Sequence, residues 1–184
     1  MNTLDETTRK VGSFEFIITS DLTDSFWQRH IAAEKLPYFA FYSTFRGAVI
    51  FLRSTQGLIN QSEGLEELVS VVLQDCIMSG WCTVLADNVY IMGHTQEEAV
   101  KRWQIVLELM AANNLKLSAK KTACFPTKLD LLGWTKQGKN LVPDPHRQNC
   151  LAKAALPITV KQLRSYLGGY RTFYRCKENM SFIL

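Results

Sequence analysis

Two aspartates stand at the ends of apolar runs that are typical of β-strands. Asp21 ends "FEFIITSD", and Asp87 lies at the tip of "CTVLADNVYIMGHT", which has the pattern of a tight β-hairpin. Carboxylates at the ends of adjacent strands form an oxygen cage for a hard cation such as Mg²⁺, as two-metal phosphoryl transfer requires. From spacing alone, a turn or capping role for each acid remains the alternative, because the pair Asp87-Asn88 has the residue types of a hairpin turn.

The elements that would position these acids show alternating strand and helix patterns. Strands are predicted at 14–21, 37–43 and 47–54, with "TFRG" as the turn between the last two. Apolar residues recur at helical spacing over 62–80, where Gly80 would close an amphipathic helix. After the hairpin, "TQEE" is a capping box that predicts a second helix beginning at Thr95.

The C-terminal part combines short strands with a helical end. Strands are predicted around 128–142, with Gln137-Gly138 as a hairpin turn. A second capping box, Thr159 with Gln162, predicts the last helix.

Hairpins mixed with helices, without regular βαβ units, predict an α+β fold with an antiparallel sheet. We expect one domain over residues 1–144 and a small basic helical region over residues 145–184.

Composition excludes several classes of protein. Hydrophobic residues make up 47% of the 184 residues, which is enough for a packed core. No apolar run approaches the roughly 18–20 residues that a membrane span needs, so no membrane partner is expected. The five cysteines are odd in number and lack a CxxC pair. This pattern favours reduced thiols and an intracellular location, cytoplasmic or nuclear, over a disulfide framework or a zinc site.

Charge is distributed unevenly along the chain. Residues 1–100 hold 6 Lys/Arg against 13 Asp/Glu, whereas residues 101–184 hold 15 against 4. The basic C-terminal half is interleaved with aromatic residues, as in "RSYLGGYRTFYRCK". This pattern favours a polyanionic partner such as nucleic acid, with a solvated basic face as the alternative.

Six segments follow one another along the chain as "DLTDSFWQ", "STQGLINQS", "LADN", "LKLSAKKTACF", "LLGWTKQGKNLVPDPHR" and "PITVKQLRSYLGGYRTFYR". Together they resemble the ordered motifs of the reverse transcriptases of LTR retrotransposons and retroviruses, in the gypsy-like or Pao-like branch. The resemblance covers roughly residues 14–175. It implies a polymerase palm-like sheet with packed helices and a thumb-like C-terminal region.

The resemblance also implies an activity, RNA-directed DNA polymerisation, with Mg²⁺ or Mn²⁺ as cofactor and a primer–template and dNTPs as partners. Asp21 and Asp87 would bind the metal, and Lys121 (or Lys120) would donate a proton to the leaving pyrophosphate. The other implied positions are nucleotide contacts at Asp24, Phe26 (a gate against a ribose 2′-OH), Gln56 and Gly57, and a primer grip at Leu132, Gly133 and Trp134. Core packing, a turn or a solvated basic patch is the structural alternative for these residues.

The sequence departs from this family at two places. Asn88 stands where the family has a second aspartate, so a neutral amide replaces a carboxylate. Anionic ligands offset the repulsion between divalent cations, so this loss is expected to weaken metal binding and catalysis. Only 20 residues precede Asp21, so the fingers are expected to be largely absent. We therefore expect a truncated, impaired copy (a pseudoenzyme), with a non-catalytic nucleic-acid-binding module or an interaction protein on the same scaffold as alternatives.

Overall fold

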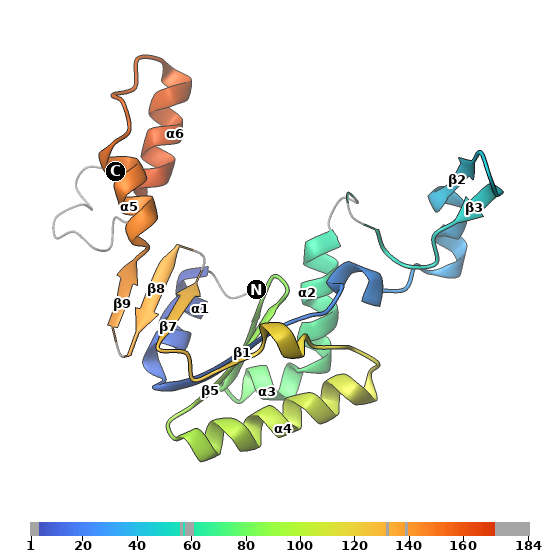
Figure 1. The fold of residues 1–184 in the computed structure, drawn as a ribbon, viewed down its shortest axis with the longest axis horizontal. Coiled ribbons are helices and arrows are strands. Elements are labelled where there is room, and N and C mark those ends of the chain that lie inside the picture. Colours follow the sequence, from blue (N-terminus) through green and yellow to red (C-terminus); the bar gives the residue numbers. More distant parts are fainter. Residues whose placement is uncertain (1–3, 56, 58–60, 132, 139, 172–184) are drawn as a thin grey trace. The chain divides into compact units, whose positions relative to one another are not determined.

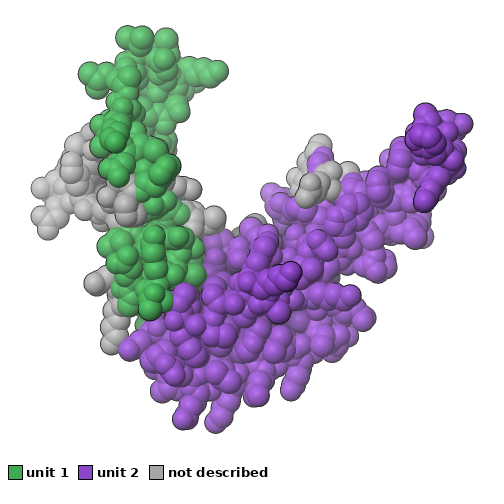
Figure 2. Space-filling view, viewed as in Figure 1, with its two compact units in different colours: residues 1–13, 127–184 green, residues 14–126 purple. Residues whose placement is uncertain are grey.

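The computed structural model describes residues 4–55, 57, 61–131, 133–138 and 140–171. The chain divides into two compact units, one formed by residues 14–126 and the other by residues 1–13 together with 127–184 (Figure 2). The boundary predicted between residues 144 and 145 remains a prediction.

A four-stranded antiparallel sheet forms the centre of the larger unit, in the order β4–β5–β1–β6 (Figure 1). Its strands are β1 (Phe16–Asp21), β4 (Cys82–Leu85), β5 (Asn88–Gly93) and β6 (Ala123–Cys124). β5 is buried on both faces, from Val89 to Gly93, because it lies between two strands and beneath helices. The predicted α+β class with antiparallel sheets is confirmed.

Three helices pack against this sheet: α2 (Gln61–Val72), α3 (Gln74–Met78) and α4 (Gln96–Ala112). The single helix predicted over 62–80 is divided at Leu73, whose side chain is fully buried in the core. Among the helices that the structure describes, none is long and apolar enough to cross a membrane. The fully buried side chains of the shared core include Ile18, Val69, Leu73, Val89, Ile91, Ala99 and Val106.

The predicted capping box of α4 is confirmed. The Thr95 hydroxyl accepts the Glu98 amide at 3.1 Å, and the Glu98 carboxylate accepts the His94 amide at 2.6 Å. The His94 amide is the largest cause that lowers the pKa of Glu98. The helix presents Ala99, Val106 and Met110 to the core, whereas Leu107 is 41% exposed.

A separate two-stranded sheet extends the larger unit between β1 and α2. It follows the short helices η1 (Ser25–Gln28) and η2 (Ala33–Phe39), and consists of β2 (Ala40–Ser43) and β3 (Gly47–Ile50). The two strands confirm the predicted hairpin, although residues 37–39 belong to η2 rather than to a strand.

The smaller unit contains a three-stranded antiparallel meander, β7 (Lys128–Leu131), β8 (Trp134–Gln137) and β9 (Asn140–Pro143). The predicted hairpin is present, but its turn comes one residue later than predicted. Gln137 pairs with Asn140 as the last residue of β8, and Gly138, with a φ of 59°, begins the turn.

Helices complete the smaller unit: α1 (Leu4–Ser13), which the sequence analysis did not foresee, α5 (Pro145–Ala152) and α6 (Val160–Arg171). The second predicted capping box is present at α6. The Thr159 hydroxyl accepts the Gln162 amide at 3.2 Å, and the Gln162 side chain accepts the Thr159 amide at 3.1 Å.

Gly93 provides a test of how closely β5 packs on α4. A Cβ at this position would lie 2.8 Å from the amide nitrogen of Ala99 and 2.9 Å from the carbonyl oxygen of Thr95. Because both are backbone atoms, Gly93→Ala is expected to lower the free energy of unfolding by about 1–3 kcal/mol. Urea denaturation followed by circular dichroism measures the change.

The matched control is Gly168→Ala in α6, where an added Cβ meets no atom within 4 Å. Alanine is the better helix former, so this variant should be neutral or stabilised. Equal stability of Gly93→Ala and the unmodified chain would contradict the close contact.

Candidate catalytic site on the central sheet

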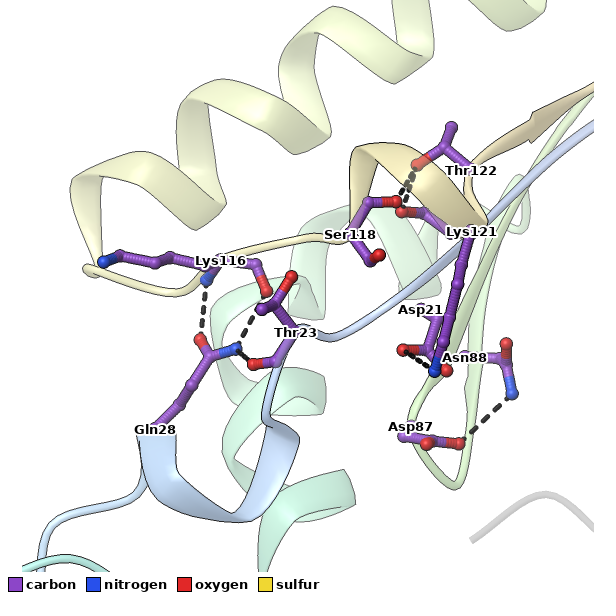
Figure 3. Close-up of polar contacts among 10 residues, drawn as sticks. Asp21, Thr23, Gln28, Asp87, Asn88, Lys116, Ser118, Lys121 and Thr122 are labelled. Atoms are coloured by element: carbon purple, nitrogen blue, oxygen red, sulfur yellow. Dashed lines mark hydrogen bonds and ion pairs between the residues drawn. The ribbon is translucent and has the colours of Figure 1, made fainter.

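The pairing of β1 with β5 brings the two predicted metal ligands together. Asp21, the last residue of β1, lies opposite Asn88, the first residue of β5. The amide of the next residue, Leu22, donates to the carbonyl oxygen of Asp87 at 3.0 Å. Figure 3 shows the side chains of Asp21, Asp87 and Asn88 gathered at this end of the sheet.

The hairpin that presents Asp87 turns one residue earlier than predicted. Leu85 pairs with Asn88, so the two loop residues are Ala86 and Asp87 rather than Asp87 and Asn88. Ala86 has a φ of 55°, a left-handed conformation that costs a non-glycine residue about 1–3 kcal/mol. β5 also pairs with β1 on its other side, and this second ladder fixes the register that places Asn88 in the strand.

Lys121 is the lysine that faces the acids. Its Nζ lies 3.1 Å from Oδ1 of Asp21, with the lysine side chain 66% exposed and the aspartate side chain 14% exposed. The short helix η3 (Ala119–Lys121) positions it, and the Ser118 amide before η3 donates to the Asp21 carbonyl at 2.7 Å. Among the ion pairs of the described residues none involves Lys120. Of the two lysines, Lys121 is thus the one that contacts Asp21, and its role as proton donor remains a prediction.

Asn88 interacts directly with the acid beside it. Its Nδ2 donates to Oδ1 of Asp87 at 3.2 Å, as Figure 3 shows. An aspartate at this position would repel Asp87 instead. The Asn88 amide therefore stabilises the Asp87 carboxylate in the absence of a metal, and Asn88 itself offers only one side-chain oxygen as a potential metal ligand.

The donor set fits one hard cation better than two. Within the described ranges, no group of three or more His, Cys, Asp or Glu side chains could hold a metal ion. Two carboxylates and one amide oxygen nevertheless match the sites of Mg²⁺, which is often held by one or two carboxylates with water and substrate phosphates. Lys121 cancels one of the two negative charges, so a single net charge remains for a cation.

Gln28, which no sequence motif had singled out, forms hydrogen bonds to the segment that follows α4. The Gln28 side chain accepts the Lys116 amide at 2.6 Å and donates to the Lys116 carbonyl at 2.8 Å, and it also donates to the Thr23 carbonyl. These bonds join η1 to the segment that follows α4 (Figure 3). No local sequence pattern distinguishes this glutamine, because its partner lies 88 residues away.

The predicted nucleotide contacts lie in the same unit. Asp24 has a φ of 45° and precedes η1, and Phe26 in η1 is partly buried against the hydrophobic core. Gly57 has a φ of 93°, which suits the turn predicted there. Gln56 lies outside the described residues. Packing and turn formation account for these three positions, and their nucleotide contacts remain predictions.

The predicted primer grip belongs to the smaller unit. Gly133 has a φ of 106°, and Trp134 begins β8, paired with Leu131 and Pro143. Leu132 lies outside the described residues. A tight hairpin is therefore present at this position, and its contact with a primer remains a prediction.

Two comparisons relate this chain to retroelement proteins. No protein-family model matches the sequence. The retrovirus-related Pol polyprotein from transposon opus of Drosophila melanogaster is 26% identical over 172 residues, which is 94% of this chain and 17% of the polyprotein. The Pol polyprotein from transposon gypsy of the same organism is 27% identical over 165 residues, 90% of this chain and 16% of the polyprotein. This chain is a distant homologue of retroelement Pol polyproteins. It spans about a sixth of their length.

Solved structures of foamy viral protease–reverse transcriptase share the fold. One in complex with double-stranded DNA superposes with a TM-score of 0.78 at 22% identity, over 92% of this chain and 29% of the viral one. Another, in complex with an RNA/DNA hybrid, gives a TM-score of 0.70 at 20% identity, over 95% of this chain and 23% of the viral one. The α+β architecture of this Pol homologue is thus that of part of a retroviral enzyme.

Tyr90 is buried in β5, two residues after Asn88. Burial, and secondarily the charge of Asp87, raises the pKa of Tyr90 from 10 to about 12. The phenol therefore keeps its proton to a higher pH than a solvent-exposed tyrosine does.

The shift of Tyr90 predicts a pH dependence of stability. Because the folded pKa is raised, the folded state keeps the proton after the unfolded state has lost it. The stability is fully present below pH 10 and is lost as pH rises toward 12, by up to about 3 kcal/mol at about 1.4 kcal/mol per unit.

Urea denaturation across this pH range measures the loss, and Tyr90→Phe is the control for other groups that titrate there. The free energy of unfolding of the unmodified chain minus that of Tyr90→Phe should fall as pH rises from 10 to 12, because only the unmodified chain loses the contribution of Tyr90. A constant difference would show that Tyr90 ionises normally in the folded chain.

Proposed function

We propose that Asp21 and Asp87 form the metal-binding pair of a palm-like nucleotidyl-transfer centre, as in a retroelement reverse transcriptase. The observation that supports this most directly is the register that places Asp21 opposite Asn88 and bonds Leu22 to Asp87. Two acids far apart in sequence thereby meet at the end of a central strand pair. Distant homology to retroelement Pol polyproteins supplies the reaction class.

The residues of the site take the following roles in this proposal. Asp21 and Asp87 hold Mg²⁺ or Mn²⁺, and the bound ion would polarise phosphate oxygens and stabilise the leaving pyrophosphate. Lys121, released from Asp21, holds a proton at Nζ for the leaving oxygen. The proposed substrate contacts are Asp24, Phe26, Gln56 and Gly57 for the nucleotide, and Leu132, Gly133 and Trp134 for the primer.

The same geometry weakens the proposed centre. Asn88 contributes a neutral oxygen, and its amide holds Asp87 at 3.2 Å. Lys121 occupies an oxygen of Asp21 that the cation would need. Cation binding must displace this lysine, at a modest cost because an exposed ion pair contributes about 0–1 kcal/mol. We therefore expect weak metal binding and low or absent polymerase activity.

Binding of Mn²⁺, measured by electron paramagnetic resonance, tests the metal site without requiring activity. Lys121→Gln removes the competing cation and should tighten binding by about two- to tenfold. Lys120→Gln is the matched control because it removes the same charge from the adjacent residue. Equal effects of the two substitutions would contradict a direct competition at Asp21, and undiminished binding by Asp21→Asn would contradict the site itself.

Primer extension with dNTPs and Mg²⁺ or Mn²⁺ tests the reaction. The unmodified chain should incorporate few or no nucleotides, and Asn88→Asp should bind Mn²⁺ more tightly and raise incorporation, because it adds an anionic ligand. Asn149→Asp, which adds the same charge at an exposed position of α5, is the control. Robust incorporation by the unmodified chain would disprove the impairment.

A second candidate function is nucleic-acid binding without turnover. It is favoured by the 15 Lys/Arg against 4 Asp/Glu in residues 101–184. Binding to a primer–template duplex should then weaken steeply as salt rises, because phosphate contacts release counterions. Failure to bind any duplex at low salt would eliminate this candidate.

A further inference from the structure

The hairpin between β1 and α2 exposes aromatic rings that the proposed centre does not use. We name residues 33–53, which contain η2, β2 and β3, the aromatic hairpin. Tyr38 is 82% exposed, Tyr42 is 80% exposed and Phe45, in the turn, is 96% exposed. Rings of this size are usually buried, so three in one short segment mark a surface that meets a partner.

The two faces of the aromatic hairpin differ. Phe41, opposite Val49, stacks on Phe51 at 4.9 Å between ring centroids, and Phe51 in turn contacts Trp27 at 5.8 Å. On that face the rings contact one another, although each of them remains 37–46% exposed.

The other face is open. Alternation along the strands places Tyr42 with Ala40, Ala48 and Ile50. Tyr42 lies opposite Ala48, and the small side chains leave the phenol ring uncovered. A planar group can therefore approach this ring from solvent.

Positive charge accompanies these rings in an otherwise acidic half of the chain. Residues 29–53 hold four of the six Lys/Arg of residues 1–100, and Glu34 is their one acid. The remainder of residues 1–100 has two Lys/Arg against twelve Asp/Glu. Arg46 follows Phe45 in the turn, and neither Arg46 nor Lys35 forms an ion pair with a described residue. These cations are thus available to an anionic partner.

We propose that the aromatic hairpin binds single-stranded nucleic acid, with bases stacked on Tyr42 and Phe45 and phosphates near Arg46 and Lys35. Open rings interleaved with cations suit a strand whose bases are unstacked. A duplex offers its phosphates but not its base faces, so the rings favour the single strand. The binding surface is formed without Asp21 or Asp87 and does not depend on the proposed activity.

Fluorescence anisotropy with a labelled oligothymidylate tests this surface in the full chain. Tyr42→Ala and Phe45→Ala should each weaken binding about tenfold, as expected for one base–aromatic stack, whereas Tyr42→Phe should retain it. Arg46→Gln should weaken binding and reduce its salt dependence. Matched controls are Met78→Ala, which removes a side chain 79% exposed elsewhere, and Lys101→Gln, which removes an exposed charge in α4.

A duplex of the same length separates this surface from the basic C-terminal half. Duplex binding and Mn²⁺ binding should be unchanged in the Tyr42 and Phe45 variants. If the unmodified chain fails to bind Mn²⁺ or duplex, that failure contradicts the proposed function and leaves single-strand binding by the hairpin to be judged by its own assay. Photo-crosslinking of a bromodeoxyuridine strand to the unmodified chain should label peptides containing residues 38–46.

Three results would overturn the proposal. The first is crosslinking confined to other peptides, and the second is equal loss from the Tyr42→Ala and Met78→Ala variants. The third is sedimentation showing that Phe45 mediates self-association while single strands do not bind, which would assign the rings to a protein contact.

Discussion

The antiparallel pairing of β1 with β5 is the constraint on which the rest of the larger unit depends. Its register runs from Phe16 opposite Gly93 to Asp21 opposite Asn88. A slip of one residue would replace Val89 and Ile91, the β5 side chains in the shared core, by residues of the strand's other face. The end near Gly93 requires close backbone packing on α4, and the opposite end brings the acids together. The same strand pair therefore contributes to the core at one end and positions the acids at the other.

The charges at this end of the sheet then determine how strongly it can bind a metal ion. Two carboxylates near one another would repel, and here an ammonium at 3.1 Å and an amide at 3.2 Å relieve that repulsion. The interactions that stabilise the acids without a metal are the ones a cation must displace. Tyr90 remains neutral behind them, so Asp21, Asp87 and Lys121 are the charged groups that set the balance. A stable fold and a strong metal site thus place opposite demands on Asn88 and Lys121.

The basic residues of the larger unit's first part are concentrated in the segment that also exposes aromatic rings. Acidic residues dominate the first hundred positions, except around the hairpin over 33–53, where exposed rings and cations occur together. A two-stranded hairpin is marginally stable alone, and Phe41, Phe51 and Trp27 on one face give it a small apolar cluster. Tyr42, on the second face, takes no part in this cluster and is 80% exposed.

Features that rest on local interactions could be predicted from the sequence. Both capping boxes, the β2–β3 hairpin and the strand ending at Asp21 follow from neighbouring residues, and the ordered motifs indicated the relationship to retroelement proteins. Only the tertiary fold reveals the break at Leu73, the one-residue shift of the turn to Ala86, the pairing of Lys121 rather than Lys120 with Asp21, and the bridge from Gln28. Each of these depends on partners distant in sequence, because core burial and a second strand ladder override local preference.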